Sequence, residues 1–300
     1  MNLNSIWSML EESMNILGDD HGYPVMFKRA EELAPESNWL TWVPAVSMFA
    51  PDTFTVAEFM RIFPYGLARL NKDRLAIGVQ SGYLTTDDQD GYCATESGKN
   101  VTRLVTEAFD QAIASVQFLS DESFLPLVGH LYKLVEATFA TAKPTAGFLF
   151  SGKRNMRPLR MEGLPHQLEQ YISELAGYRD DMYVATWSAH GVEGHTWEVL
   201  DRLSQSDALT FDELHEKTSG RGVTREVHAA DVQELARRGW TEESSGKIQI
   251  TSAGKQVRAE VEAETERLFF APWSCLNESE LEELASLASQ LRDGLKSSSE

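Results

Sequence analysis

The chain has 300 residues, of which 42% are apolar and 10% aromatic, so it is expected to fold into a globular protein with room for two domains. Its 46 acidic residues outnumber 27 Lys and Arg, and the formal charge of −19 excludes a protein that coats nucleic acid non-specifically. No apolar run predicts a membrane span, and the acidic N-terminus is unlike a signal peptide. Cys93 and Cys275 are isolated, which predicts free thiols and a cytoplasmic protein.

Helical periodicity runs through most of the chain. Apolar residues recur at helical spacing from Leu3 to Leu17, and Gly18 is expected to end that helix. Pro44 is expected to interrupt the aromatic stretch 38–43. The pattern predicts helices over 3–17, 25–33, 66–79, 95–119 and 123–140 in the first half, and over 165–178, 180–189, 195–203, 224–238, 253–270 and 278–295 in the second.

One pattern occurs twice, about 156 residues apart. Its segments are 54–59, 82–84 and 95–99 in the first copy, and 209–214, 239–241 and 251–255 in the second. Each copy reads as a short helix, a second helix ending at Gly, two strands around a polar turn, and a helix beginning at Thr. That order is typical of a winged helix. Two copies predict a mainly α fold with small β-hairpin wings, arranged as a tandem pseudo-dimer of the kind that binds two DNA half-sites.

Between the copies, residues 141–163 break the helical pattern with several Pro and Gly residues. This predicts a first half over 1–145, a linker over 146–164 and a second half over 165–300. The segment also holds five basic residues, Lys143, Lys153, Arg154, Arg157 and Arg160. They are expected to be solvated, and a contact with phosphate is the alternative.

The second copy is the better candidate for binding DNA. Residues 217–258 hold eight Lys or Arg and five Asp or Glu, a net charge of +3, whereas residues 55–103 hold six of each. Thr224 is expected to cap a recognition helix that ends before Gly239. A helical wheel places Val232, Leu235 and His228 toward the core and Glu226, Ala230, Gln233 and Arg237 on the opposite face.

We therefore predict that Arg225, Gln233 and Arg237 of this helix contact DNA together with Lys247 of the wing. Glu226 and the acidic residues beside Lys247 weaken this prediction, and a protein-packing module remains the alternative. In the first copy, the predicted helix 66–79 carries Arg69, Lys72 and Arg74, which could also meet phosphate. The acidic segment 87–90 of its wing would repel phosphate, so a structural role is expected there.

Other chemistry is less well supported. His166, His190, Glu193 and His195 could approach one another, but their spacing matches no strong metal motif, so we expect solvent-facing histidines at helix ends and no metal or cofactor. No phosphate loop or catalytic motif is present, and we expect no enzyme. The indoles of Trp39, Trp42, Trp187 and Trp197 are expected either in the core or around a flat apolar ligand between the halves.

A family resemblance covers about a quarter of the chain. Its residues are Leu235-Ala236-Arg237-Arg238-Gly239, Ile250-Thr251-Ser252-Ala253-Gly254-Lys255, 258–268 and Ala271-Pro272-Trp273. The stretch resembles the C-terminal part of MarR-like winged helices, and it is more similar to a largely actinobacterial helix-turn-helix group labelled SalK-like. Residues 178–183 resemble a His-Arg-Gly-Asp-Gly-His segment of that group, with Tyr178 and Tyr183 in place of both histidines. The resemblance implies a regulator whose small-molecule ligand changes its DNA affinity.

The sequence thus favours a cytoplasmic transcriptional regulator with tandem winged helices. A ligand between the halves would alter their fit to DNA half-sites, and a monomer is favoured because the second copy supplies the partner internally. The alternative is a winged-helix scaffold that binds a small molecule or a protein and does not bind DNA.

Overall fold

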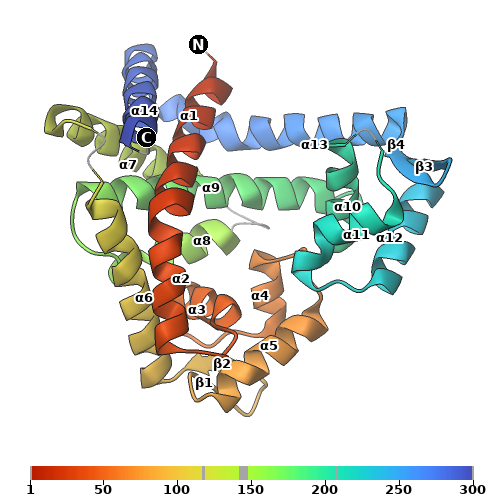
Figure 1. The fold of residues 1–300 in the computed structure, drawn as a ribbon. Helices are drawn as coiled ribbons and strands as arrows, with labels where there is room; N and C mark the ends of the chain where they lie inside the picture. The colour runs from red at the N-terminus through yellow and green to blue at the C-terminus, as the bar shows by residue number, and fades with distance from the viewer. Residues whose placement is uncertain (1, 117–118, 142–147, 207, 299–300) are drawn as a thin grey trace. The chain divides into compact units, whose positions relative to one another are not determined.

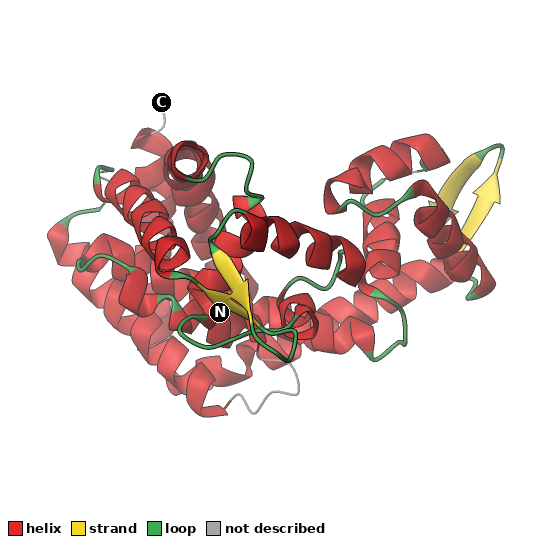
Figure 2. Cartoon of the chain, turned by 90° about the horizontal axis from the view of Figure 1, so that it is seen from below, coloured by secondary structure: helices red, strands yellow, loops and turns green. Residues whose placement is uncertain are grey.

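The computed structural model describes residues 2–116, 119–141, 148–206 and 208–298 (Figure 1). The described chain is mainly helical, and its strands form two small antiparallel hairpins, drawn as yellow arrows in Figure 2. The α-helices are α1 (Leu3–Asn15), α2 (Tyr23–Leu33), α3 (Trp39–Phe49), α4 (Val56–Ile62), α5 (Ala68–Gln80), α6 (Glu96–Ala114), α7 (Asp121–Thr141), α8 (Phe148–Asn155), α9 (Leu164–Ser188), α10 (Gly194–Ser204), α11 (Phe211–Thr218), α12 (Arg225–Arg237), α13 (Ser252–Phe270) and α14 (Glu278–Ser298).

The strands are β1 (Leu84–Thr86), β2 (Tyr92–Ala94), β3 (Thr241–Ser244) and β4 (Lys247–Ile250), and shorter helices are η1 (Ile16–Gly22), η2 (Arg157–Leu159), η3 (Ser219–Arg221) and η4 (Ala271–Cys275). The predicted fold class, mainly α with hairpin wings, is confirmed, whereas the pseudo-dimer arrangement stays a prediction. None of the described helices is both long and apolar enough to span a membrane.

The chain divides into two compact units. Unit one consists of Met1–Phe54, Arg74–Asp180 and Phe269–Glu300, and unit two consists of Thr55–Asp73 and Asp181–Leu268. Each unit contains residues from both predicted halves, and the predicted linker over 146–164 stays a prediction. The described part of that predicted linker forms α8 and η2.

The predicted end of the first helix at Gly18 is wrong. The chain stays helical from α1 through the π-helical η1 into α2. A Cβ at Gly18 would lie 2.7 Å from the Tyr23 ring, and one at Gly22 would lie 2.3 Å from the Phe109 ring. These glycines therefore allow aromatic rings to pack closely, and they do not terminate the helix.

Two further predicted breaks are absent. Pro44 lies inside α3, and α9 runs without a break from Leu164 to Ser188 where two helices were expected. Buried Tyr178 and Met182 continue the apolar face of α9 across the predicted break. Packing of that face outweighs the weak local signal for a turn.

In unit one, α1 packs on α14, and α2 and α3 both pack on α6. Trp7 and Phe269 make an edge-on contact between α1 and α13, with ring centroids 4.8 Å apart. In unit two, one core joins α10, α11, α12, β4 and α13. Its buried members include Trp197, Leu200, Leu214, Leu235, Trp240, Ile248 and Val261.

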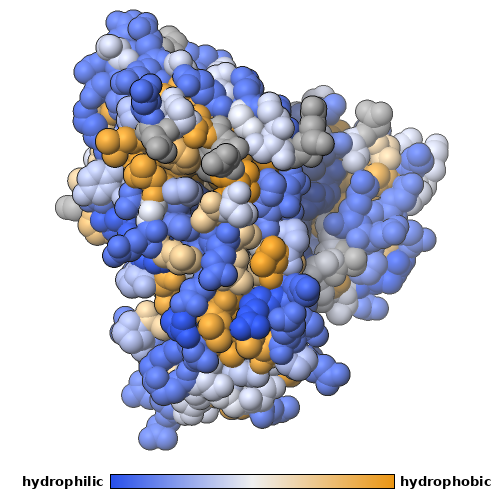
Figure 3. All heavy atoms as spheres, turned by 60° about the vertical axis from the view of Figure 1, so that its left-hand side comes forward, coloured by the Kyte–Doolittle hydropathy of each residue, from blue (hydrophilic) through white to orange (hydrophobic). Residues whose placement is uncertain are grey.

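The exposed apolar surface belongs to one unit. All the large apolar side chains that are exposed in the described residues lie in unit one: Val25, Phe27, Leu40, Leu125, Tyr132, Phe139, Phe148 and Met161. Figure 3 shows one side of the molecule, where orange apolar side chains gather in separate areas among blue hydrophilic ones. The second winged helix, which lies in unit two, therefore presents a polar surface.

Candidate nucleic-acid interface

The second winged helix begins with two capped helices. Thr210 and Glu213 form a reciprocal cap at the start of α11, in which the Glu213 carboxylate accepts from the Thr210 amide at 2.8 Å and the Thr210 hydroxyl accepts from the Glu213 amide at 3.3 Å. Thr224 caps α12 by accepting from the Val227 amide. These caps satisfy amide groups that a helix leaves unpaired at its start, so the predicted start of the recognition helix is confirmed.

The wing follows directly. Gly239 has a φ of 73°, which turns the chain out of α12 into Trp240 and β3. Strands β3 and β4 pair in register from Thr241 with Ile250 to Ser244 with Lys247. Ser245 and Gly246 form the connecting turn with φ values of 53° and 74°, the signature of a two-residue type I′ turn. Lys247 thus lies at the tip of the wing.

The predicted inner face of α12 packs inward: His228 and Leu235 are buried, and Val232 is partly buried against the core. Asp231, which was not predicted to face inward, is also buried. The opposite face is exposed, and its members are Arg225, Glu226, Ala230, Gln233, Ala236 and Arg237. Gln233 and Arg237 therefore share the surface that a groove of DNA could meet.

The two arginines of this face already have acidic partners. Arg225 pairs with Asp212 of α11 and lies over the Phe211 ring, with its guanidinium carbon 5.0 Å from the ring centroid. Arg237 donates two hydrogen bonds to Glu234, at 2.8 and 2.7 Å. Hydrogen bonds from Arg237 and Arg238 lower the pKa of Glu234 to about 2, so this carboxylate stays charged at any working pH.

Gln233 and Lys247 are exposed, and the described residues offer their side chains no hydrogen-bond or ion-pair partner. The side chain of Arg237 is 70% exposed despite its partner. Pairs of this kind contribute little in water, so Arg237 can exchange Glu234 for another anion at small cost. Gln233, Arg237 and Lys247 are therefore available on α12 and the wing. The side chain of Arg225 is also 52% exposed, but it stacks on the Phe211 ring in addition to its pair with Asp212.

Beneath the exposed face lie titratable groups that the sequence did not predict to interact. Asp231 of α12 is 3% exposed and is 2.8 Å from His195 Nδ1, and the Thr196 hydroxyl donates to it at 2.6 Å. His228 of α12 is 1% exposed, and its Nδ1 lies 2.8 Å from Nδ1 of His215 on α11. The sequence predicted the burial of His228. It could not predict the contacts of His228 with His215 or of Asp231 with His195, because these partners are 13 and 36 residues apart.

The first copy of the repeat has the same element order, given by α4, α5, β1, β2 and α6. On α5, Arg69 and Lys72 are exposed and make no ion pair with any described residue. The acidic wing turn is organised by Asp87, whose carboxylate accepts from the amides of Gln89 and Gly91, both at 2.8 Å. Asp87 therefore stabilises the turn of this wing and also contributes to its negative charge.

The four tryptophans predicted to line a ligand pocket are buried. Trp39 and Trp42 belong to unit one, and the Trp42 indole stacks on Tyr83 and donates to the Ser37 carbonyl at 3.0 Å. Trp187 and Trp197 belong to the core of unit two, where Trp197 donates to the Tyr183 hydroxyl at 2.8 Å. These contacts suit core residues, and the pocket stays a prediction.

A shallow groove of about 400 Å³ lies elsewhere in unit two, between the end of α9 and α13. Its lining is Ala185, Thr186, Ala189, His190, Glu260, Glu264 and Leu268. None of the four tryptophans contributes to it.

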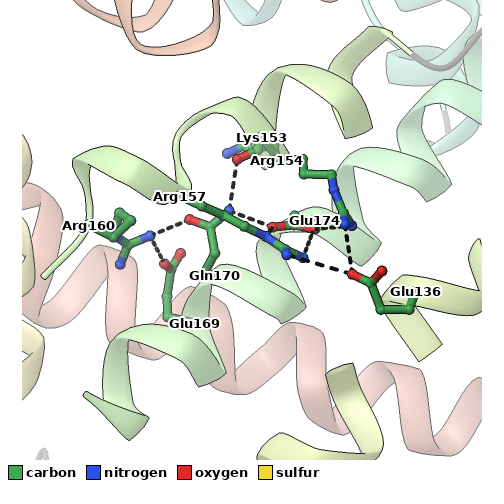
Figure 4. A network of polar contacts seen from close by, with 8 residues as sticks. All are labelled: Glu136, Lys153, Arg154, Arg157, Arg160, Glu169, Gln170 and Glu174. Atoms are coloured by element: carbon green, nitrogen blue, oxygen red, sulfur yellow. Dashed lines mark hydrogen bonds and ion pairs between the residues drawn. The ribbon is translucent and has the colours of Figure 1, made fainter. Parts of the chain in front are cut away.

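Arg154, Arg157 and Arg160 of the predicted linker form ion pairs, so the expectation that they are solvated is wrong, whereas Lys143 lies outside the described residues. Arg157 makes a bidentate contact with the fully buried Glu174 at 2.6 and 2.7 Å, as Figure 4 shows. Arg154 donates to Glu136 at 2.8 Å, and Arg160 donates to Glu169 at 2.6 Å. The network fastens α8 and η2 to α9 and leaves these guanidinium groups no role in phosphate binding.

The expectation of solvent-facing histidines is wrong for two of the three. His166 is 4% exposed, and its Nε2 donates to the Asp110 carbonyl at 3.1 Å within unit one. The His195 side chain is only 17% exposed and is paired with Asp231. Among the described residues, no group of three His, Cys, Asp or Glu side chains is placed to hold a metal ion. Both cysteines are free thiols.

Comparison with known proteins adds one finding. A family model described as a helix-turn-helix family matches residues 89–299, which include the whole second winged helix. No curated protein and no solved structure matches the chain. The match supports the helix-turn-helix part of the sequence resemblance, whereas the MarR-like and SalK-like relationships stay predictions.

Proposed function

Because the chain belongs to this helix-turn-helix family, we propose that it is a DNA-binding transcriptional regulator whose second winged helix contacts DNA. The observation that carries the proposal is the exposed face of α12 beside the wing. Gln233, Arg237 and Lys247 are exposed there, and they suit base edges or phosphates.

The charge of this surface suits regulated binding better than tight binding. Phosphate must replace Glu234 as the partner of Arg237, and Glu226, Glu242 and Glu243 are exposed nearby. Each acid opposes the attraction of the duplex, so affinity depends on a well-matched sequence. We further propose that the first copy serves as the structural half of an internal pseudo-dimer. We also propose that a small-molecule ligand acts on this pseudo-dimer and that the chain is a monomer.

The test is binding of the full chain to a library of randomised duplexes, followed by fluorescence anisotropy on the selected duplex at several salt concentrations. Arg237→Ala is expected to lower affinity about tenfold, and Lys247→Ala is expected to reduce the slope of affinity against salt by about one. Gln233→Ala should relax sequence preference with little change in that slope.

The chain offers a matched control for Arg237. Arg267 on α13 makes the same two-bond pair with a glutamate three residues before it, at 2.7 and 2.6 Å, and its side chain is 64% exposed. Arg267→Ala should leave DNA affinity unchanged. If Arg237→Ala and Lys247→Ala also leave it unchanged, the interface is wrongly assigned.

A scaffold that does not bind DNA is the second candidate. It is favoured by the acidic partners of Arg225 and Arg237 and by the overall charge of −19. Failure to select any duplex at low salt, with the chain folded, would support it.

A further inference from the structure

The recognition helix α12 is attached to its neighbours by two titratable contacts. Asp231 joins it to His195 and Thr196 of α10, and His228 joins it to His215 of α11. His228 and Asp231 are both almost fully buried. Protonation therefore acts directly on the helix whose outer face is the proposed DNA interface.

The contact between His215 and His228 tolerates only one shared proton. Two Nδ1 atoms 2.8 Å apart form a hydrogen bond when one carries hydrogen and the other is bare. The Thr218 hydroxyl, 3.4 Å from His228 Nδ1, is the other polar group beside it. If both rings are protonated, two N–H groups and two positive charges oppose each other, and the contact must open.

The surroundings of His228 oppose its charging. Burial lowers its pKa, the nearby Asp231 raises it, and His215 and His195 lower it further. The exposed acids and base of α11 are Asp212, Glu213, Glu216 and Lys217, and those of β3 are Glu242 and Glu243. Glu226 of α12 also lies close enough to His215 to interact with its charge.

The other attachment responds to pH in the opposite direction. The hydrogen bond with Asp231 raises the pKa of His195, so the stability from this pair is present below the ordinary histidine pKa and is lost as pH rises through the raised value. For His228 the folded pKa is lowered, so stability is lost as pH falls through the ordinary value near 6.5. Acidification thus weakens the contact between α12 and α11 and preserves the contact between α12 and α10.

In the first copy of the repeat, the corresponding contact is made by two residues that do not titrate. Counting from Gly82 and Gly239, Asn71 on α5 corresponds to His228. Counting from the capping residues Thr55 and Thr210, Met60 on α4 corresponds to His215. The Asn71 amide donates to the Met60 sulfur at 3.0 Å, and Asn71 is 6% exposed. The same pair of positions therefore joins the same two helices in both copies, and only the second copy makes it from two histidines.

We propose that the His215–His228 pair is a proton-sensitive latch that holds α12 in its DNA-binding position and releases it on mild acidification. This inference rests on the proposed function for its consequence, whereas the latch itself is a property of the free protein. DNA affinity is expected to fall by about tenfold from about pH 7.5 to about pH 5.5, beyond the change shown by a variant without the latch.

The decisive variant transplants the contact of the first copy into the second, as the double substitution His215→Met and His228→Asn. It should bind DNA at about pH 7.5 as the natural chain does and lack the additional tenfold fall toward about pH 5.5. His130→Gln is the control, because His130 pairs with Glu283 in unit one, and it should keep the natural pH profile. Equal pH profiles for the natural chain and the double variant would overturn the latch.

A measurement without DNA separates this inference from the proposed function. NMR titration of the natural chain should show His215 and His228 titrating as a coupled pair, with lower amide protection factors in α11 and α12 as pH falls. Independent titration, or exchange in α12 that follows only the intrinsic pH effect, would overturn the latch even if DNA binds. If the pair is coupled but no duplex binds at any pH, the latch stands and the proposed function fails.

Discussion

The two winged helices have the same backbone features and different surfaces. In both, Thr begins the helix after the wing and donates from its hydroxyl to a glycine carbonyl, Thr95 to Gly82 at 2.8 Å and Thr251 to Gly239 at 2.6 Å. In both, an isolated bridge ties the preceding segment to the second strand, Phe54 to Tyr92 and Leu209 to Ile248. The shared features are those that close the turns and begin the helices.

The outer faces share almost nothing. Counting from Gly82 and Gly239, the positions of Arg225, Gln233 and Arg237 hold Ala68, Ala76 and Gln80 in the first copy. Counting from Thr95 and Thr251, the position of Lys247 holds Gly91. Conversely, Arg69 of α5 corresponds to Glu226. The comparison teaches that geometry is repeated where a glycine or threonine is required, while the surface of each copy is free to serve a separate role.

The largest expected effect tests the repeated geometry. A Cβ at Gly98 would lie 2.1 Å from the Tyr83 carbonyl oxygen, and one at Gly254 would lie 2.2 Å from that of Trp240. Backbone cannot move aside cheaply, so Gly98→Ala and Gly254→Ala should each lower the free energy of unfolding by about 3 kcal/mol. Urea denaturation measures this. Gly129→Ala, at an open helical position, should instead stabilise by about 0.5–1 kcal/mol. Tolerance of alanine at either Gly98 or Gly254 would contradict the shared geometry.

A smaller effect tests the shared helix caps. Thr55 and Glu58 at the start of α4 reproduce the reciprocal bonds of Thr210 and Glu213, at 2.7 and 3.2 Å. Thr55→Ala and Thr210→Ala should each cost about 1 kcal/mol in thermal or urea unfolding. A loss confined to one copy would show that the other cap is dispensable and would sharpen the difference between the copies.

The smallest effect tests the surface difference. Glu234→Gln removes the acidic partner of Arg237 and should raise DNA affinity about threefold in the anisotropy assay, since the guanidinium no longer has to leave a carboxylate. Glu264→Gln, which frees Arg267 in the same way, should change nothing. An equal gain in both variants would mean that net charge alone, and not the α12 surface, controls binding.

The sequence predicted the features that depend on single residues with strong local effects. Gly82 and Gly239 marked the helix ends, Thr95 and Thr251 marked the helix starts, and the two hairpins followed between them. The faces of α12 were also predictable, because His228, Val232 and Leu235 recur every three or four residues and therefore lie on one side of the helix. The prediction that Gly18 ends the first helix was wrong, because this glycine allows the Tyr23 ring to pack closely and does not form a turn.

What the sequence could not predict depends on contacts between distant segments. Asp231 is 36 residues from His195, and Arg160 is 50 residues from Asp110, so only the fold reveals that these charges are paired. The acidic partners of Arg225 and Arg237 lie closer, 13 and 3 residues away, but their pairing depends on side-chain conformations that composition does not specify. A count of charges therefore overstated how many cations are free.

The most direct test of the account is hydrogen exchange of the full chain with and without the selected duplex. The account predicts slower exchange on DNA addition over Arg225–Arg237 and over the wing from Thr241 to Ile250, with α5 unchanged. Protection confined to α5, or DNA binding that leaves α12 and this wing unprotected, would contradict it.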